Sequence, residues 1–187
     1  MEVAILNLQE NIPKFIFHYS RGTPFLSITS VPEKKLLQIV DQLTQANAWG
    51  IGRFSDQHYL NQRIETESQI RNAFIAKGGQ PQLQQPIYFF LGSNKLFENH
   101  RLNKAYKIEL QKVSSKNISF TYGDSMLAFN EFNRAQSGIK YQSPLCAKVY
   151  MLEELESVFL SPHFPSQGPL AIEAQLWSTL TLDIVEN

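Results

Sequence analysis

An acidic residue at the centre of an otherwise apolar segment near the C-terminal end constrains this chain most. Residues 169–177 alternate with the period of two that is typical of a β-strand. One face carries Ile172, Ala174 and Leu176, and the other carries Ala171, Glu173, Gln175 and Trp177. A second apolar run at 180–185 places this segment inside a sheet. Because burying a carboxylate is costly unless it is paired or used, Glu173 either faces solvent beside Gln175 or has a function.

Composition limits the class of protein. The length of 187 residues suits a single domain, expected to span 1–187, and a hydrophobic content of 43% indicates a folded chain. The formal net charge is zero, so any contact with nucleic acid must come from a local patch. The lone Cys146 fits a reducing compartment, and neither a signal peptide nor a bilayer-spanning run is visible. We expect a cytoplasmic protein without membrane contact.

The apolar periodicity predicts a strand, two helices, several strands, a short helix and two last strands. The expected strands are 15–19, 87–91, 105–113, 117–122, 169–177 and 180–185, and a short helix is expected over 153–159. The first two helices begin at the N-caps Ser30 and Asp56, and Gly78-Gly79 ends the second. Residues 133–144 are expected to form a polar loop. This order predicts an α+β fold with a predominantly antiparallel sheet.

The second predicted helix carries charged residues at regular spacing. Its apolar stripe consists of Leu60, Ile64, Ile70 and Phe74. On another face Arg63, Glu67 and Arg71 follow one another at every fourth residue, a pattern typical of a solvated helix. Arg71 lies shortly before the glycine pair, so the alternative is that it points into a cleft.

His18 lies near the end of the first predicted strand and is followed by Ser20 and Gly22. It is either a core histidine with satisfied ring nitrogens or a donor to a ligand at the end of the strand. Standard nucleotide-binding and metalloprotease motifs are absent, and the chain has no cysteine pair for zinc. The four histidines are scattered without metal-ligand spacing, so we expect no metal site.

Four segments, in sequence order, resemble the ADP-ribosyltransferase fold, and in particular the DarT-type toxins that modify DNA bases with NAD. Residues 17–21 (Phe-His-Tyr-Ser-Arg) resemble the opening strand with its ribose-binding histidine. Residues 70–90 resemble an arginine-bearing helix that runs into an aromatic strand, and 119–126 resemble a segment that reads Phe-Thr-Asp-Gly-Asn-Ala. Residues 172–176 resemble the late strand with the catalytic glutamate. The chain departs from the pattern at 92–94, where Gly-Ser-Asn replaces Arg-Ser-Pro.

The resemblance implies a split antiparallel sheet flanked by helices and an NAD-dependent transfer of ADP-ribose to a base in single-stranded DNA. It implies that Glu173 and Arg71 are catalytic. It further implies that NAD, as substrate, contacts His18, Ser20, Tyr88 and Phe89. A toxin of this type is expected to have a cognate antitoxin.

The best candidate for a nucleic-acid groove is the basic and aromatic stretch that contains Lys95, Arg101 and Lys104, although a solvated loop fits the same residues. The alternatives are transfer to protein or RNA, an RNA 2′-phosphotransferase, and a binding module without catalysis.

Overall fold

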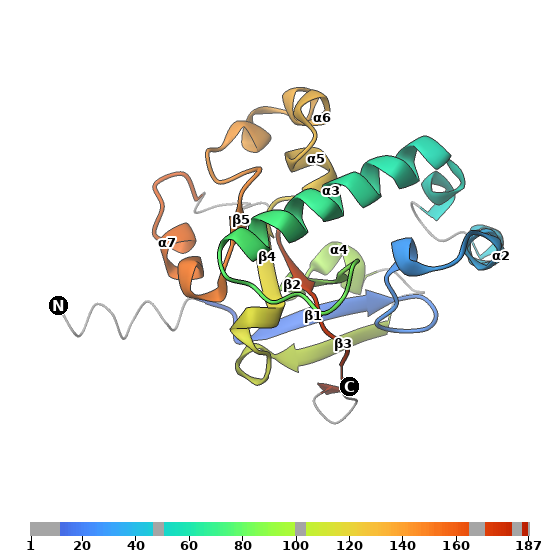
Figure 1. Ribbon diagram of the computed structural model, residues 1–187, viewed down its shortest axis with the longest axis horizontal. Helices are drawn as coiled ribbons and strands as arrows, with labels where there is room; N and C mark the ends of the chain where they lie inside the picture. Colours follow the sequence, from blue (N-terminus) through green and yellow to red (C-terminus); the bar gives the residue numbers. More distant parts are fainter. Residues whose placement is uncertain (1–11, 47–50, 100–103, 165–170, 181–184, 187) are drawn as a thin grey trace.

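The computed structural model describes residues 12–46, 51–99, 104–164, 171–180 and 185–186. Its centre is one sheet with the strand order β5-β4-β6-β2-β1-β3-β7, in which every pairing is antiparallel (Figure 1). Helices flank this sheet, so the predicted α+β class and antiparallel sheet are confirmed.

The strands are β1 (Phe15–Ser20), β2 (Ile87–Leu91), β3 (Lys104–Glu109), β4 (Ile118–Tyr122), β5 (Val149–Tyr150), β6 (Ile172–Leu176) and β7 (Val185–Glu186). The α-helices are α2 (Glu33–Gln45), α3 (Gln57–Ala76), α4 (Lys95–Glu98), α5 (Ser125–Ala128), α6 (Glu131–Gln136) and α7 (Leu155–Phe159). Short 3-10 turns connect them, among them η1 (Ile28–Ser30), η3 (Leu110–Lys112) and η5 (Ile139–Gln142).

The register of the sheet assigns the side chains to two faces. Directly paired residues of neighbouring strands share a face, and successive residues alternate. The main apolar core lies on one face and contains Ile16, Phe89, Ile108, Phe120 and Ala174. The other face carries Glu173 together with its paired residues Phe90 and Thr121. We call these the core face and the acid face.

Helix α3 covers part of the acid face. Ile70 and Phe74 pack with Val149 and Trp177, and the rings of Phe74 and Trp177 are stacked with centroids 6.3 Å apart. In Figure 1 this helix runs across the β5 and β4 side of the sheet, whereas β1 and β3 lie at the lower edge. The remainder of the acid face, along β1, is therefore not under α3.

The ends of α3 follow from the sequence as predicted. Asp56 caps the N-terminus by accepting a hydrogen bond from the backbone of His58 at 2.9 Å. At the other end Gly78 has φ +92° and Gly79 donates from its backbone N–H to the carbonyl of Phe74 at 2.9 Å. A Cβ at Gly79 would lie 2.6 Å from the ring of Phe74, so glycine is required there.

The pairing between β1 and β2 is short. Its register contains Ile16 with Leu91 and Phe17 with Phe90, whereas β1 and β3 pair from Phe15 to Ser20. The resemblance implied a split sheet. Among the described residues, hydrogen bonding joins seven strands in one sheet, with the short β1–β2 seam near its centre.

Three local predictions were wrong. Ser30 lies in η1 and bonds to the carbonyl of Ser27, while Pro32 takes the N-cap position of α2. The predicted loop 133–144 contains the end of α6 and the turn η5. The predicted strand 105–113 ends early because η3 begins at Leu110. The apolar run 180–185 lies mostly outside the described residues.

Candidate functional site

Glu173 is a buried acid in the middle of the sheet. It lies on β6 between Phe90 of β2 and Thr121 of β4, and only 9% of its surface is exposed. Its Oε2 accepts a hydrogen bond from the backbone N–H of Ser125 at 3.1 Å. The interpretation that Glu173 faces solvent is therefore wrong, and the cost of burying a carboxylate has to be explained by its surroundings.

The surroundings of Glu173 favour its protonated form more than water does. Burial, followed by the nearby negative charge of Asp124, raises the pKa of Glu173 to about 7, against the opposing effects of Arg63 and Ser125. Both protonation states are thus populated near neutral pH. A carboxyl group with such a pKa is suited to accept and release protons.

Arg63 and Glu67 form a buried ion pair beside this acid. Arg63 Nε lies 3.0 Å from Glu67 Oε1, and the two side chains are 15% and 2% exposed. The guanidinium lies 4.1 Å from the centroid of the Tyr88 ring, and Thr29 donates to Glu67 Oε2 at 2.7 Å. The expectation that this charged ladder faces solvent was wrong for these two residues. Together with Glu173, Tyr88 and Ser125, they form what we call the acid cluster.

Two hydroxyl groups of the acid cluster make no hydrogen bond of good geometry. Tyr88 Oη and Ser125 Oγ are both buried and make no hydrogen bond of good geometry in the described part of the chain, although Ser125 Oγ lies within interaction range of Glu173 and Tyr88, and Tyr88 Oη within range of Glu67. Burial raises the pKa of Tyr88 far above its ordinary value, so its hydroxyl stays protonated and available as a donor. Buried hydroxyls without partners are rare and are commonly satisfied by water or a ligand. This pair is therefore suited to a polar ligand next to Glu173.

The polar side chains next to Glu173 along β6 are hydrogen-bonded to one another. Gln175 accepts from Ser119 Oγ at 3.0 Å and donates to Thr121 Oγ1 at 2.8 Å. Ser119 Oγ in turn accepts from Trp177 Nε1 at 2.8 Å. This network fixes one wall of the acid cluster, because each of these polar groups already has its partner.

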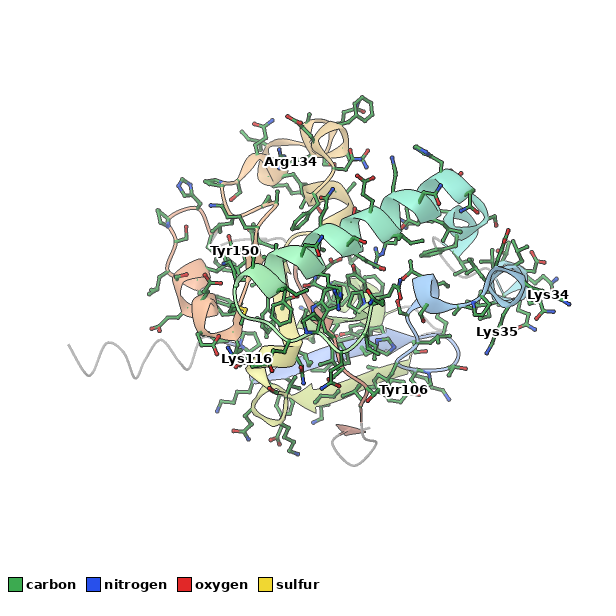
Figure 2. All side chains as sticks on the ribbon, in the orientation of Figure 1. Lys34, Lys35, Tyr106, Lys116, Arg134 and Tyr150 are labelled. Atoms are coloured by element: carbon green, nitrogen blue, oxygen red, sulfur yellow. The ribbon has the colours of Figure 1, made fainter. Side chains whose placement is uncertain are left out.

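The structure does not bring His18 to Glu173. His18 lies on the core face, where its ring contacts Phe25, Phe89 and Tyr106, with centroids 5.1, 5.3 and 6.5 Å away. Figure 2 shows Tyr106 on β3 at the lower edge of the molecule, away from α3. The resemblance implied that the imidazole contacts NAD and that the carboxylate acts on it, but here the two groups lie on opposite faces of the sheet.

Both ring nitrogens of His18 are used by the protein itself. Nδ1 donates to the carbonyl of Tyr88 at 2.8 Å, across the seam where β1 and β2 stop pairing. Nε2 accepts from the backbone of Phe25 at 3.1 Å, which holds Phe25 at its positive φ of 58°. Burial lowers the pKa of His18, against the smaller effect of the bond to Tyr88, and keeps the ring neutral. Its contacts are those of a structural histidine.

The other residues named by the resemblance are also placed elsewhere. Arg71 donates to the carbonyls of Leu83 at 3.2 Å and Pro81 at 3.4 Å, and so ties the connector to α3. Ser20 Oγ donates to the carbonyl of Gly22 at 3.1 Å. Phe89 is 1% exposed in the core. Of the residues predicted for catalysis and NAD, the acid cluster contains Glu173 and Tyr88.

One of the predicted nucleic-acid residues, Lys95, lies on α4 beside an aromatic part of the acid face. Phe17, Tyr19, Phe90 and Phe97 are half-buried there, and Tyr19 lies 5.6 Å from Phe97 and 6.0 Å from Phe90 between ring centroids. Lys95 begins α4 and Lys104 begins β3, and both are exposed, but the pairing of Lys104 with Ser20 puts Lys104 on the core face. We call this group of aromatic rings the aromatic face. Arg101 lies outside the described residues.

Sequence reasoning missed Arg63, Glu67 and Ser125. The spacing of Leu60, Arg63, Glu67, Ile70 and Phe74 alternates between three and four residues and marks a single helix face. The outer members of that face are buried, so its two charged members are buried as well. Ser125 gave no comparable signal, because its contact with Glu173 depends on how the turn after β4 folds.

Comparisons with known proteins add no assignment: no protein family, curated protein or solved structure matches this chain. In the described ranges no three His, Cys, Asp or Glu side chains are grouped so that they could hold a metal ion. Each helix that the structure describes is too short or too polar to traverse a lipid bilayer.

Proposed function

We propose that this chain is an NAD-dependent ADP-ribosyltransferase that modifies a base in single-stranded DNA, with Glu173 as its catalytic residue. One observation carries the proposal: a buried carboxyl group with a pKa of about 7 lies beside two buried hydroxyls that make no hydrogen bond of good geometry. It occupies the late strand to which the resemblance assigns the catalytic glutamate. The resemblance supplies the reaction, and the acid cluster supplies a group able to perform it.

The chemistry requires a carboxylate at the ribose. The bond between ribose C1′ and the nicotinamide nitrogen breaks, and nicotinamide leaves as a neutral molecule. A nitrogen of the acceptor base forms the new bond to C1′ and loses its proton. The transition state carries positive charge on the ribose, as in glycoside hydrolysis. Ionised Glu173 stabilises this charge and takes the proton from the acceptor, which it later releases to solvent.

The hydroxyls of Tyr88 and Ser125 are the proposed contacts for the sugar. Both are buried next to Glu173 and make no hydrogen bond of good geometry, so sugar hydroxyls would satisfy them. His18 and Arg71 are left out of the substrate contacts, because their hydrogen-bonding groups are directed to backbone atoms. In this respect the proposal differs from what the resemblance implied.

The aromatic face supports a single-stranded acceptor. Bases stack on aromatic rings whatever their sequence, and lysines at the rim attract the phosphate backbone. Phe17 and Tyr19 lie on the acid face of β1, and Lys107, which pairs with Phe17, shares that face, whereas Lys104 pairs with Ser20 and lies on the core face. Because modification of DNA harms the cell that makes the enzyme, the proposal includes a toxin role and a cognate antitoxin.

A binding module without catalysis is the second candidate. The observation in its favour is that Arg63, Glu67 and Thr29 already satisfy one another, as a purely structural polar network would. On this reading the acid cluster stabilises one arrangement of α3 on the sheet and performs no reaction.

Labelled NAD distinguishes these candidates. The wild-type protein, the Glu173→Gln variant and the control variant Glu109→Gln are incubated with labelled NAD and single-stranded DNA, RNA or protein. We expect label on DNA with the wild type and the control, and none with Glu173→Gln. Label on RNA or protein would show that the acceptor is that molecule and not DNA. Transfer that persists in Glu173→Gln would contradict the role of this residue, and absence of NAD turnover in the wild type would favour the binding module.

A further inference from the structure

Arg63 lies within electrostatic reach of two acids but forms its ion pair with one of them. Its Nε contacts Glu67 at 3.0 Å, and no ion pair between Arg63 and Glu173 is found among the described residues. Arg63 nevertheless influences the carboxyl of Glu173. The guanidinium is therefore near Glu173 without neutralising it, which raises the question of what holds it in place.

Contacts on two sides hold the guanidinium. On one side its planar group lies over the Tyr88 ring, 4.1 Å from the centroid, a favourable cation–π contact. On the other side Glu67 binds it, and Glu67 is itself fixed by the hydroxyl of Thr29 at 2.7 Å. Thr29 is tied to Ser27 at 2.9 Å between the two hydroxyl oxygens. This chain of contacts runs from η1 to α3 and anchors Glu67, which is 2% exposed.

We infer that Glu67 is a positioning residue: together with Thr29 it holds Arg63 over Tyr88 and away from Glu173, so that the Glu173 carboxylate has no cation in contact and remains able to accept a proton. The catalytic consequence of this inference rests on the proposed function. The arrangement of charges itself does not, and it can be measured without any reaction.

The groups that face Glu173 support this view. Arg63 approaches from α3, Tyr88 from β2, Asp124 from the turn before α5, and Tyr141 from η5. Arg63 is the single cation among these four groups. An arginine in direct contact lowers the pKa of a carboxyl group by about 1–3 units. If Arg63 moved onto Glu173, the carboxylate would become a much weaker base near neutral pH.

The test removes the competitor of Glu173 for Arg63. The Glu67→Gln variant keeps the size of the side chain and loses its charge. The ¹³C carboxyl resonance of Glu173 is followed by NMR against pH, and its assignment comes from the Glu173→Gln variant. We expect the pKa of Glu173 to fall by about 1–3 units in Glu67→Gln, because Arg63 turns to the remaining acid.

Two further variants complete the test. In Glu67→Gln combined with Arg63→Met the fall should disappear and the pKa should rise above that of the wild type. Thr29→Val removes the hydrogen bond to Glu67 but keeps the Glu67 side chain, so it should lower the pKa of Glu173 by a smaller amount. This variant replaces Glu67→Gln in the test if Glu67→Gln does not fold. An unchanged Glu173 titration in both Glu67→Gln and Thr29→Val would overturn the inference. If the wild type transfers no ADP-ribose, the proposed function fails while this titration still decides the positioning role.

Discussion

Replacing Glu173 by glutamine should stabilise the protein. The folded state raises the pKa of Glu173 from an ordinary value of 4.5 to about 7, mainly through burial, so it disfavours the charge that the unfolded chain carries freely. Glutamine has nearly the same shape, keeps an oxygen for the Ser125 N–H and carries no charge. A residue retained for chemistry at the expense of stability is expected to behave in this way.

The magnitude and its sign follow from proton linkage. Folded Glu173 binds its proton more tightly than unfolded Glu173, so this group makes the protein most stable below pH 4.5, and that stability is lost as the pH rises through about 7. The loss amounts to about 3 kcal/mol at pH 8 and about 1 kcal/mol at pH 5. The free energy of unfolding of Glu173→Gln should therefore exceed that of the wild type by up to these amounts at the two pH values. In a domain of this size each 1 kcal/mol raises Tm by about 2–4 °C.

Urea unfolding of the wild type and Glu173→Gln at pH 5 and pH 8 measures this difference, with Glu109→Gln as the control. The decisive quantity is how the difference in unfolding free energy between variant and wild type changes with pH. If Glu173→Gln were less stable than the wild type at pH 8, or if the difference were the same at both pH values, the reasoning about Glu173 would be refuted.

Three further predictions concern other parts of the molecule. His18→Ala should lose about 2–4 kcal/mol in urea unfolding at pH 8. Because burial lowers the pKa of His18 below its ordinary 6.5, that loss should shrink as the pH falls from 6.5 through the folded value, and an equal loss at pH 5 would contradict the neutral ring. Gly79→Ala should cost about 1–3 kcal/mol because its Cβ would lie 2.6 Å from Phe74, whereas Gly52→Ala, with no neighbour within 4 Å, should cost less. Phe17→Ala should weaken the binding of a single-stranded oligonucleotide by about 1–3 kcal/mol, as measured by fluorescence anisotropy. The control is Phe132→Ala, because Phe132 is 71% exposed and lies outside the aromatic face. An equal loss of binding in both variants would argue against the aromatic face as the binding surface.

The sequence predicted the fold class and the division of β6 into two faces, because alternation over 172–176 is a local property of the strand. It predicted both ends of α3 for the same reason, since Asp56 and the Gly78-Gly79 pair act on their own neighbours. It did not predict which of the two interpretations of Glu173 holds. That outcome depends on Phe90 and Thr121 lying on either side, and thus on pairings between distant segments.

The arginine was assigned incorrectly for a related reason. Arg71 is nearer to the helix end that meets β2 in sequence, but its side chain is drawn to the connector carbonyls of Pro81 and Leu83. Arg63 lies two turns earlier, about 12 Å along the helix axis, and reaches the ring of Tyr88. Likewise His18 and Glu173 occupy strands that are close in the sheet, yet the parity of their positions puts them on opposite faces.

The central claim is that Glu173 performs chemistry on NAD, and the intact mass of an oligonucleotide tests it most directly. A single-stranded DNA oligonucleotide is incubated with NAD and either the wild-type protein or Glu173→Gln, after both are shown to be folded. We predict a gain of one ADP-ribosyl group with the wild type and an unchanged mass with the variant. An equal mass gain with both proteins, or no gain on DNA, RNA or protein with the wild type, would contradict the claim.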